Sequence, residues 1–321
     1  MKKIGLEFLK KPWRGWSGRA LLGLGGAIAT ISIGSLASFG QAQNSPQIAA
    51  TFLPIYMFTR AVAGENTKVE ILITPGTSPH EYQATPANAR AIAEADVLVK
   101  NGLGFEEFLD KLIAAAGNSQ LIQIDSSKGI EAIEEEEHHH EHEEEHEGHH
   151  HHEEGNPHVW LDPVLAQQQV INIRDGLIDA DPNNAENYEA NAVVYLQQLQ
   201  ELDREFQTRL TPVAGCKFIA FHDAYPYLAQ RYGLQQMAVV ELPEDTIAPR
   251  DLQRIINTAK EFQIKGFLSE SGTDDSRIRQ ISNDLGLPVK VLDPLETGPL
   301  DPDYYFTAMR KNLTALEEVC R

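Results

Sequence analysis

The chain has 321 residues, of which 42% are hydrophobic, and its formal net charge is −20 at pH 7. This length is long for one hydrophobic core and comfortable for two domains. So strong a negative charge argues against nucleic acid as a partner and favours cationic ligands.

The first 42 residues have the pattern of a secretory signal. Basic side chains ending at Arg19 precede an apolar run rich in Gly and Ala at 20–39, and small residues follow at Gly40 and Ala42. This order predicts cleavage after Ala42. A retained membrane anchor is the alternative, because about twenty apolar residues can span a bilayer. The Gly, Ser and Ala of the run are weakly hydrophobic, so we expect residues 1–42 to be a cleaved signal peptide.

In the first half of the remaining chain, short β-rich runs alternate with helical patterns. Thr85 and Pro86 offer a helix N-cap followed by a proline at the first helical position. The expected strands are 47–50, 68–74, 96–100 and 121–124. The expected helices are 54–63, 85–94 and 105–116.

Residues 134–154 form a tract of nine His, eleven Glu and one Gly. With nothing apolar to bury, the tract cannot offset the entropy of ordering, so we expect a solvated, mobile loop. Imidazole favours zinc, copper and nickel, and a His-rich tract is a compositional sign of metal binding. An acidic solubilising insert is the alternative; a tag is disfavoured because the run is internal and interleaved with Glu. The His of this predicted accessory metal-binding loop are His138, His139, His140, His142, His146, His149, His150, His151 and His152.

The second half of the chain begins with a long helical pattern and then returns to alternation. Residues 183–210 contain no Gly or Pro, and their apolar side chains recur at helical spacing. One helix here would span about 42 Å. The strands expected after it are 217–221, 238–241, 266–269 and 290–292. The helices expected after it are 225–232, 249–262, 274–285 and 302–319.

Strands separated by helices predict an α/β protein with parallel sheets covered on both faces. We expect two doubly wound lobes, at 46–182 and 212–321, joined by a rigid linker helix at 183–211. Two lobes held in this way would enclose a cleft between them.

The two cysteines, Cys216 and Cys320, are an even pair in a chain expected to be exported, which favours a disulfide. Such a bridge closes a loop of about 100 residues and is worth up to ~4.7 kcal/mol by chain entropy. Two buried thiols are the alternative. Two Cys so far apart are a poor zinc-ligand pair by themselves.

Outside the Glu/His tract the chain has three His, namely His80, His158 and His222. His80 and His222 follow predicted strands, and ligands of open α/β sheets bind at the carboxyl ends of strands. A single His at such a place is more often structural, but three beside a His-rich loop indicate a metal site. Three neutral imidazoles fill three corners of a tetrahedral zinc site, and nitrogen ligands disfavour manganese.

The fourth position of this predicted site stays open between a carboxylate and water. Asp293 and Glu296 lie just past the last strand, and Glu270 ends another strand. Acids at strand ends are more often helix caps or solvated groups. Asp293 is the first candidate, with Glu296 and water as alternatives.

Four segments together resemble one family, the metal-specific solute-binding proteins of ABC importers, and within it the ZnuA-type zinc-binding proteins. They are TPGTSPHEY at 74–82, KNGLGFE at 100–106, HVWLDP at 158–163 and FHDAYPYL at 221–228. The similarity runs from residue 47 to the C-terminus. It implies a periplasmic zinc carrier of two α/β lobes joined by a long helix, with Zn²⁺ bound between the lobes by His80, His158 and His222. The implied partners are an inner-membrane permease and its cytoplasmic ATPase.

Details of the resemblance bear on the metal and on the fourth ligand. Manganese-type relatives have a carboxylate where this chain has His222, so His222 favours zinc. Some zinc-type members have Glu directly before the first ligand, whereas this chain has Pro79, which leaves the fourth ligand to Asp293, Glu296 or water. In the similar manganese sites, an Asp ten residues before a segment like 303–305 is a ligand, and Asp293 stands at that distance.

Two other functions fit some of these features. A secreted zinc hydrolase also uses three His and an open fourth position. However, the chain has no His-Glu-x-x-His motif and no His pair at helical spacing outside the tract. A metal-sequestering or adhesive surface protein on the same scaffold is the other alternative. We therefore expect a monomeric carrier that is not an enzyme and does not bind nucleic acid.

Overall fold

The structure, a computed structural model, describes residues 45–80, 82–134, 155–240, 249–270 and 276–321. At 221–222, 238–240 and 249–251 it describes the backbone alone. The predicted signal peptide at 1–42 and the nine His of the Glu/His tract lie outside the described residues. Among the described helices, none has the length and apolar character needed to cross a bilayer.

The first lobe is built on a parallel sheet with strand order β2-β1-β3-β4. Its strands are β1 (Ile48–Ala50), β2 (Val69–Ile71), β3 (Val97–Lys100) and β4 (Ile122–Asp125). Its helices are α1 (Leu53–Ala63), α2 (Pro86–Glu94), α3 (Leu109–Ala116) and α4 (Pro163–Ala180). Alternate residues of β3 bury on opposite faces, since Leu98 packs with residues of α2 and α3 while Val97 and Val99 join the main core. Both faces of this sheet are therefore covered.

The second lobe repeats the arrangement with strand order β6-β5-β7-β8, again all parallel. Its strands are β5 (Lys217–His222), β6 (Gln235–Val240), β7 (Gly266–Glu270) and β8 (Val289–Leu292). Its helices are α6 (Pro226–Arg231), α7 (Pro249–Glu261), α8 (Ser276–Leu285) and α9 (Tyr304–Cys320). Phe267 of β7 packs with residues of α7 and α8, whereas its neighbour Leu268 joins the main core. The predicted class, two doubly wound α/β lobes, is confirmed.

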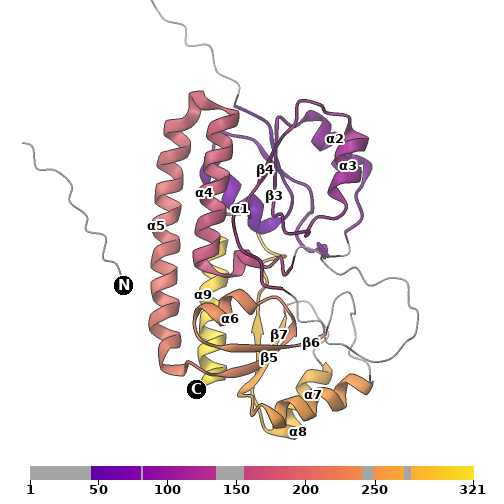
Figure 1. The fold of residues 1–321 in the computed structure, drawn as a ribbon, viewed down its shortest axis with the longest axis vertical. Helices are drawn as coiled ribbons and strands as arrows, with labels where there is room; N and C mark the ends of the chain where they lie inside the picture. Colours follow the sequence, from indigo (N-terminus) through magenta and orange to yellow (C-terminus); the bar gives the residue numbers. More distant parts are fainter. Residues whose placement is uncertain (1–44, 81, 135–154, 241–248, 271–275) are drawn as a thin grey trace, which may run out of the picture. The chain divides into compact units, whose positions relative to one another are not determined.

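The long helix α5 (Ala185–Leu210) connects the lobes and confirms the helix predicted at 183–210. Its 26 residues give a length of about 39 Å at 1.5 Å per residue. The helix packs against α1 and α4 of the first lobe and against α9 of the second (Figure 1). Its buried residues are Tyr188, Ala192, Tyr195, Leu199, Leu202, Phe206 and Leu210. Because these belong to one core cluster with residues of both lobes, α5 is part of the shared core as well as a connection.

The predicted elements are present, with boundary differences that have local causes. Thr85 caps α2 through a capping box with Asn88, and Pro86 occupies the first turn as expected. The helix predicted at 105–116 begins only at Leu109. Gly102, Leu103 and Gly104 have positive φ, and this left-handed backbone reverses the chain before a helix can begin. Strand β6 begins at 235 instead of 238.

Helix α4 is absent from the elements predicted from the sequence. Asp162 caps it by accepting a hydrogen bond from Val164 N at 2.8 Å, and Pro163 occupies its first turn. This is the same cap-and-proline start that identified α2, so the signal was present in the sequence. Its weakly amphipathic sequence, with several Gln, makes the apolar periodicity faint.

The predicted disulfide between Cys216 and Cys320 is present. Cys216 directly precedes β5, and Cys320 is the last residue of α9. Both side chains are buried in the main core. The bridge therefore ties the C-terminal helix to the start of β5, an inner strand of the second sheet.

Candidate metal centre

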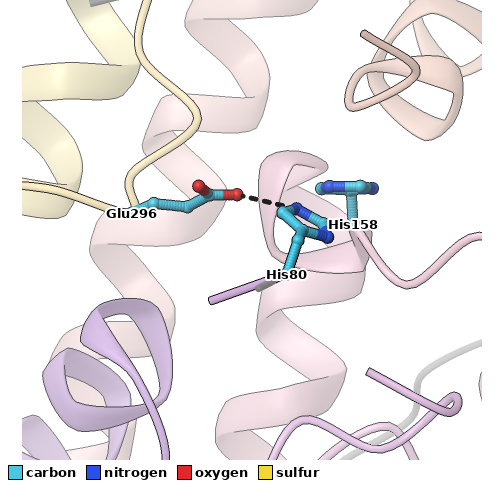
Figure 2. A group of neighbouring side chains, drawn as sticks. All are labelled: His80, His158 and Glu296. Carbon is cyan, nitrogen blue, oxygen red and sulfur yellow. Dashed lines mark hydrogen bonds and ion pairs between the residues drawn. The ribbon is translucent and has the colours of Figure 1, made fainter. Parts of the chain in front are cut away.

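The described part of the chain contains one group of side chains arranged to hold a metal ion: His80, His158 and Glu296. One ligand atom from each lies within 4.8 Å of the others. His80 lies in the loop after β2, His158 lies directly before a 3₁₀ turn at Val159–Leu161, and Glu296 follows β8. Figure 2 shows His80 between the other two side chains. The group thus joins the two lobes.

The closest pair in this group is an imidazole and a carboxylate. His80 Nε2 lies 3.2 Å from Glu296 Oε1, and both side chains are nearly buried, at 10% and 13% exposed. With zinc–ligand bonds of about 2.0 Å, two ligands at tetrahedral angles lie about 3.3 Å apart. The observed spacing fits two ligands of one zinc ion, which would replace the proton shared between these atoms.

The second imidazole, His158, is held by the residues next to it. Its side chain is buried, and its Nδ1 lies 3.1 Å from Asn156 Oδ1. Its ring centroid is 5.3 Å from that of His80. A metal-binding His typically has its other ring nitrogen hydrogen-bonded, which fixes the direction of the ligating nitrogen.

Aromatic rings form the wall behind the two imidazoles. Phe105 meets His80 edge-on at a centroid distance of 5.2 Å, and Trp160 lies 5.0 Å from His158. Phe52 packs on both Phe105 and Trp160. Apolar walls exclude water and lower the local dielectric, so a charged ligand and a cation attract more strongly there than at the surface.

The loop that carries Phe105 is held by the buried carboxylate of Glu106. Its Oε1 accepts hydrogen bonds from Thr51 Oγ1 at 2.7 Å and from Asn101 N at 2.6 Å. Its Oε2 accepts one from Gly102 N at 3.1 Å. Burial raises the pKa of Glu106, and these hydrogen bonds act in the opposite direction. Since both oxygens accept hydrogen bonds, an acceptor-only carboxylate fits this place.

Replacing Glu106 with Gln is expected to lower the free energy of unfolding by about 1–3 kcal/mol. The amide nitrogen of Gln cannot accept the hydrogen bonds that one of the two carboxylate oxygens now receives, so a buried N–H loses its partner. Urea denaturation measures the change. The exposed Glu131, changed to Gln, is the control and should shift stability by less than about 0.5 kcal/mol. Equal effects of the two substitutions would contradict this account of Glu106.

Glu296 reaches the first lobe through the loop that follows β8. Trp160 Nε1 donates a hydrogen bond to Pro294 O at 2.8 Å, which ties this loop to the first lobe. Leu295 has a positive φ of 65°, so the chain turns sharply just before Glu296. The turn and the tie together direct Glu296 to His80.

Asp293, the first candidate for the fourth ligand, lies outside the metal-binding group. Its Oδ1 accepts a hydrogen bond from Leu295 N at 2.8 Å, and its Oδ2 accepts one from Tyr304 OH at 2.7 Å. Its carboxylate thus shapes the turn before Glu296. The spacing that favoured Asp293 in the sequence does not bring it to His80 and His158, whereas its alternative Glu296 is there.

The other candidates lie at strand ends, as the sequence suggested. His222 is the last residue of β5, the neighbour of β7 in the sheet, and its side chain lies outside what the structure describes. Glu270 is buried at the end of β7 but is not a member of the His80–His158–Glu296 group. Both backbones are at the carboxyl edge of the second sheet, where ligands of such sheets bind.

Comparison with known proteins identifies a family and relatives that are named for zinc uptake. The family described as zinc-uptake complex component A, periplasmic (ZnuA), matches residues 48–319. The high-affinity zinc uptake system protein ZnuA of Bacillus subtilis (strain 168) is 33% identical over 276 residues, covering 84% of this chain and 86% of that protein. A crystal structure of ZnuA has a TM-score of 0.73 and 28% identity, covering 86% of this chain and 100% of that one.

A longer relative is also similar. The crystal structure of Zn(II)-bound AdcA from Streptococcus pneumoniae has a TM-score of 0.73 and 30% identity. The alignment covers 86% of this chain but only 58% of that chain. The family match extends over nearly all of the two lobes, including every residue of the candidate metal centre. This chain belongs to the ZnuA family of periplasmic zinc-uptake components.

Proposed function

We propose that this protein binds Zn²⁺ tightly in the periplasm and delivers it to an ABC-type importer. The observation that carries the proposal is the His80–Glu296 pair, with 3.2 Å between ligand atoms, beside the buried His158. Two imidazoles and a carboxylate that meet between two lobes can enclose a cation. The relatives are named for zinc uptake and for bound zinc, which supports zinc as the transported ion.

The proposed ligands are His80, His158 and His222, with Glu296 as the fourth. His222 is added because it ends the inner strand β5 at the carboxyl edge of the second sheet, and Asp223, the next residue, is hydrogen-bonded to the loop of His158. Three imidazoles and one carboxylate suit tetrahedral zinc. Manganese, by contrast, prefers more oxygen ligands.

A carboxylate in the fourth position also favours transport over catalysis. Catalytic zinc keeps a position open for water, whereas closed four-ligand sites hold the ion without reacting. Glu296 lies close enough to His80 to bind the same ion, and it would fill the position that a catalytic zinc leaves open for water. We therefore infer that the protein is not an enzyme. Hydrolysis of an ester or a peptide that depends on zinc would contradict this inference.

The partners follow from the same proposal. A component of a zinc-uptake complex hands its ion to other components, and we propose an inner-membrane permease coupled to a cytoplasmic ATPase. We further propose that residues 1–42 direct export and are then removed, and that the mature protein acts as a monomer. The net charge of −20 offers no electrostatic attraction to nucleic acid.

The test is a competitive metal titration of the mature protein. Trp160 is the only Trp outside residues 1–42, and its ring is 5.0 Å from that of His158, so its fluorescence reports on the site. Zinc is expected to bind at one tight site and to displace manganese at equal concentrations. Failure to compete with a zinc chelator, or a preference for manganese, would overturn the proposed function.

Deleting the Glu/His tract is expected to lower the total zinc bound while leaving the tight site unchanged. The tract contributes nine imidazoles for weaker binding but none of the proposed ligands. Asn156 N donates a hydrogen bond to Ile133 O at 2.9 Å, so the two ends of the segment lie together and a short Gly-Ser connection can replace residues 134–154. Equilibrium dialysis gives the stoichiometry, and chelator competition gives the tight affinity.

A matched control separates the imidazoles of the tract from its length and charge. A variant with all nine tract His changed to Gln should match the deletion variant in stoichiometry and in tight affinity. Loss of the tight site in both variants would show that the tract supplies a ligand and would contradict the proposed division.

A further inference from the structure

Asn156 stands two residues before His158 and contacts both lobes. Its side chain is only 1% exposed. Its Oδ1 accepts a hydrogen bond from His158 N at 3.1 Å and lies 3.1 Å from His158 Nδ1. Its Nδ2 donates to Asp223 O at 2.7 Å and lies 3.3 Å from Asp223 Oδ2. The buried amide of Asn156 therefore connects the proposed ligand His158 to Asp223, the residue that follows the proposed ligand His222.

These contacts determine which way the amide of Asn156 faces. A backbone N–H can only donate, so the atom facing His158 N must be the amide oxygen. A backbone carbonyl can only accept, so the atom facing Asp223 O must be the amide nitrogen. The two assignments agree, and reversing the amide would place two donors together at one end and two acceptors at the other.

The orientation of Asn156 in turn sets the protonation of His158. Because Asn156 Oδ1 can only accept, His158 Nδ1 must carry a proton and donate it. A neutral imidazole has one N–H, so the lone pair is on Nε2. Only a nitrogen with a lone pair can coordinate zinc.

The second lobe holds Asn156 in this orientation. Asp223 accepts a hydrogen bond on its Oδ1 from Gln236 Nε2, and Gln236 Oε1 accepts one from Tyr225 N at 2.9 Å. Tyr227 OH donates to Asn156 O at 2.6 Å. Asn156 is thus held by α6 and by the loop between β5 and α6, and β6 holds that loop in place.

We propose that Asn156 is a positioning residue that makes Nε2 of His158 the zinc-binding nitrogen, with its amide held in that orientation by His158 N of the first lobe and by Asp223 O of the second. The proposal rests on the proposed zinc function and specifies how one ligand is prepared. Asn156 itself does not touch the ion. Both lobes thus contribute hydrogen bonds that prepare this ligand.

The direct test is the tautomer of His158 in the zinc-free mature protein. Long-range proton–nitrogen NMR distinguishes a protonated Nδ1 from a protonated Nε2, and the missing signals of a His158→Gln variant assign the ring. The expected result is a proton on Nδ1 in the unsubstituted protein and a mixture of tautomers in Asn156→Ala. A proton on Nε2 in the unsubstituted protein would overturn the proposal.

Zinc affinity supplies the second readout. Asn156→Ala should weaken tight binding by about 10–100-fold, the usual effect of removing the hydrogen-bond partner of a metal-binding His.

The control is Asn118→Ala, which removes hydrogen bonds from an Asn amide to Ile92 O and Ala95 O at the end of α2, away from the metal centre. It should leave zinc affinity unchanged. Unchanged affinity in Asn156→Ala would count against the proposal.

Failure of the proposed zinc function and failure of the role of Asn156 give different results. If the unsubstituted protein binds no zinc tightly, the proposed function fails, yet the tautomer in the zinc-free protein still decides the role of Asn156. If Asn156→Ala does not fold, the tautomer of His158 in the unsubstituted protein decides it.

Discussion

Changing His80 or His158 to Ala is expected to abolish tight zinc binding, with a loss of about 100-fold or more in affinity for each. Four-ligand zinc sites bind with about 10–16 kcal/mol, so one ligand accounts for about 3 kcal/mol, and each 1.4 kcal/mol is tenfold. Chelator competition measures the affinity, and Trp160 fluorescence shows whether the site still responds. His222→Ala should have the same effect if His222 is the third imidazole.

The fourth ligand can be identified with a matched pair of substitutions. Glu296→Gln removes the charge that faces His80 at 3.2 Å and should weaken zinc binding strongly. Asp293→Asn keeps an oxygen that can accept from Leu295 N, and its amide can donate to the oxygen of Tyr304, so the turn is retained. We expect Asp293→Asn to weaken binding much less than Glu296→Gln. A larger loss of affinity in Asp293→Asn than in Glu296→Gln would make Asp293 the fourth ligand. Tight zinc binding in His80→Ala would remove His80 from the ligand set.

Removing the disulfide is expected to lower the free energy of unfolding by about 2–5 kcal/mol. Cys216 and Cys320 are separated by 104 residues, so the bridge restricts a long loop in the unfolded chain. Zinc affinity should change little, because Cys216 precedes the start of β5 and the proposed ligand His222 is at its other end, about 20 Å away. Thermal unfolding of a variant with both Cys changed to Ser measures the effect on stability.

Reduction of the unsubstituted protein is the control for this variant. A reducing agent should lower its melting temperature by about 4–20 °C, which is the range expected for 2–5 kcal/mol in a large domain, and should leave the double Ser variant unchanged. Equal stability of the oxidised and reduced proteins would show that the bridge contributes nothing. A large loss of zinc affinity in the double variant would show that the disulfide end of β5 is coupled to the metal centre.

Local sequence rules predicted the elements where the local signal was strong. Thr85 and Pro86 marked the start of α2, and the apolar spacing along α5 matched its buried face. They failed at the start of α3. There the left-handed backbone at 102–104 delays the helix, and the spacing of apolar side chains does not indicate this. Helix α4 was missed although its cap at Asp162 was visible, because its apolar periodicity is weak.

The ligands of the candidate metal centre were also only partly predictable from the sequence. His80 and His158 were identified from the sequence because so few His lie outside the Glu/His tract and because loops at strand ends suit ligands. The choice between Asp293 and Glu296 could not be made from spacing, since both follow β8 closely. It depends on the turn at Leu295 and on the bond from Trp160 to Pro294, which joins residues 134 positions apart.

The sequence by itself determined that this chain forms two parallel α/β lobes, that its two Cys favour a disulfide, and that its isolated His suit a transition metal. These properties depend on local periodicity, on residue counts and on the chemistry of imidazole. Only the tertiary structure decided that α5 belongs to a core shared by both lobes and that Glu296 meets His80. It also decided that Asn156 faces His158 with its oxygen and Asp223 with its nitrogen. Those facts depend on contacts between residues far apart in the chain, whose directions are set by packing and hydrogen bonds that no local pattern records.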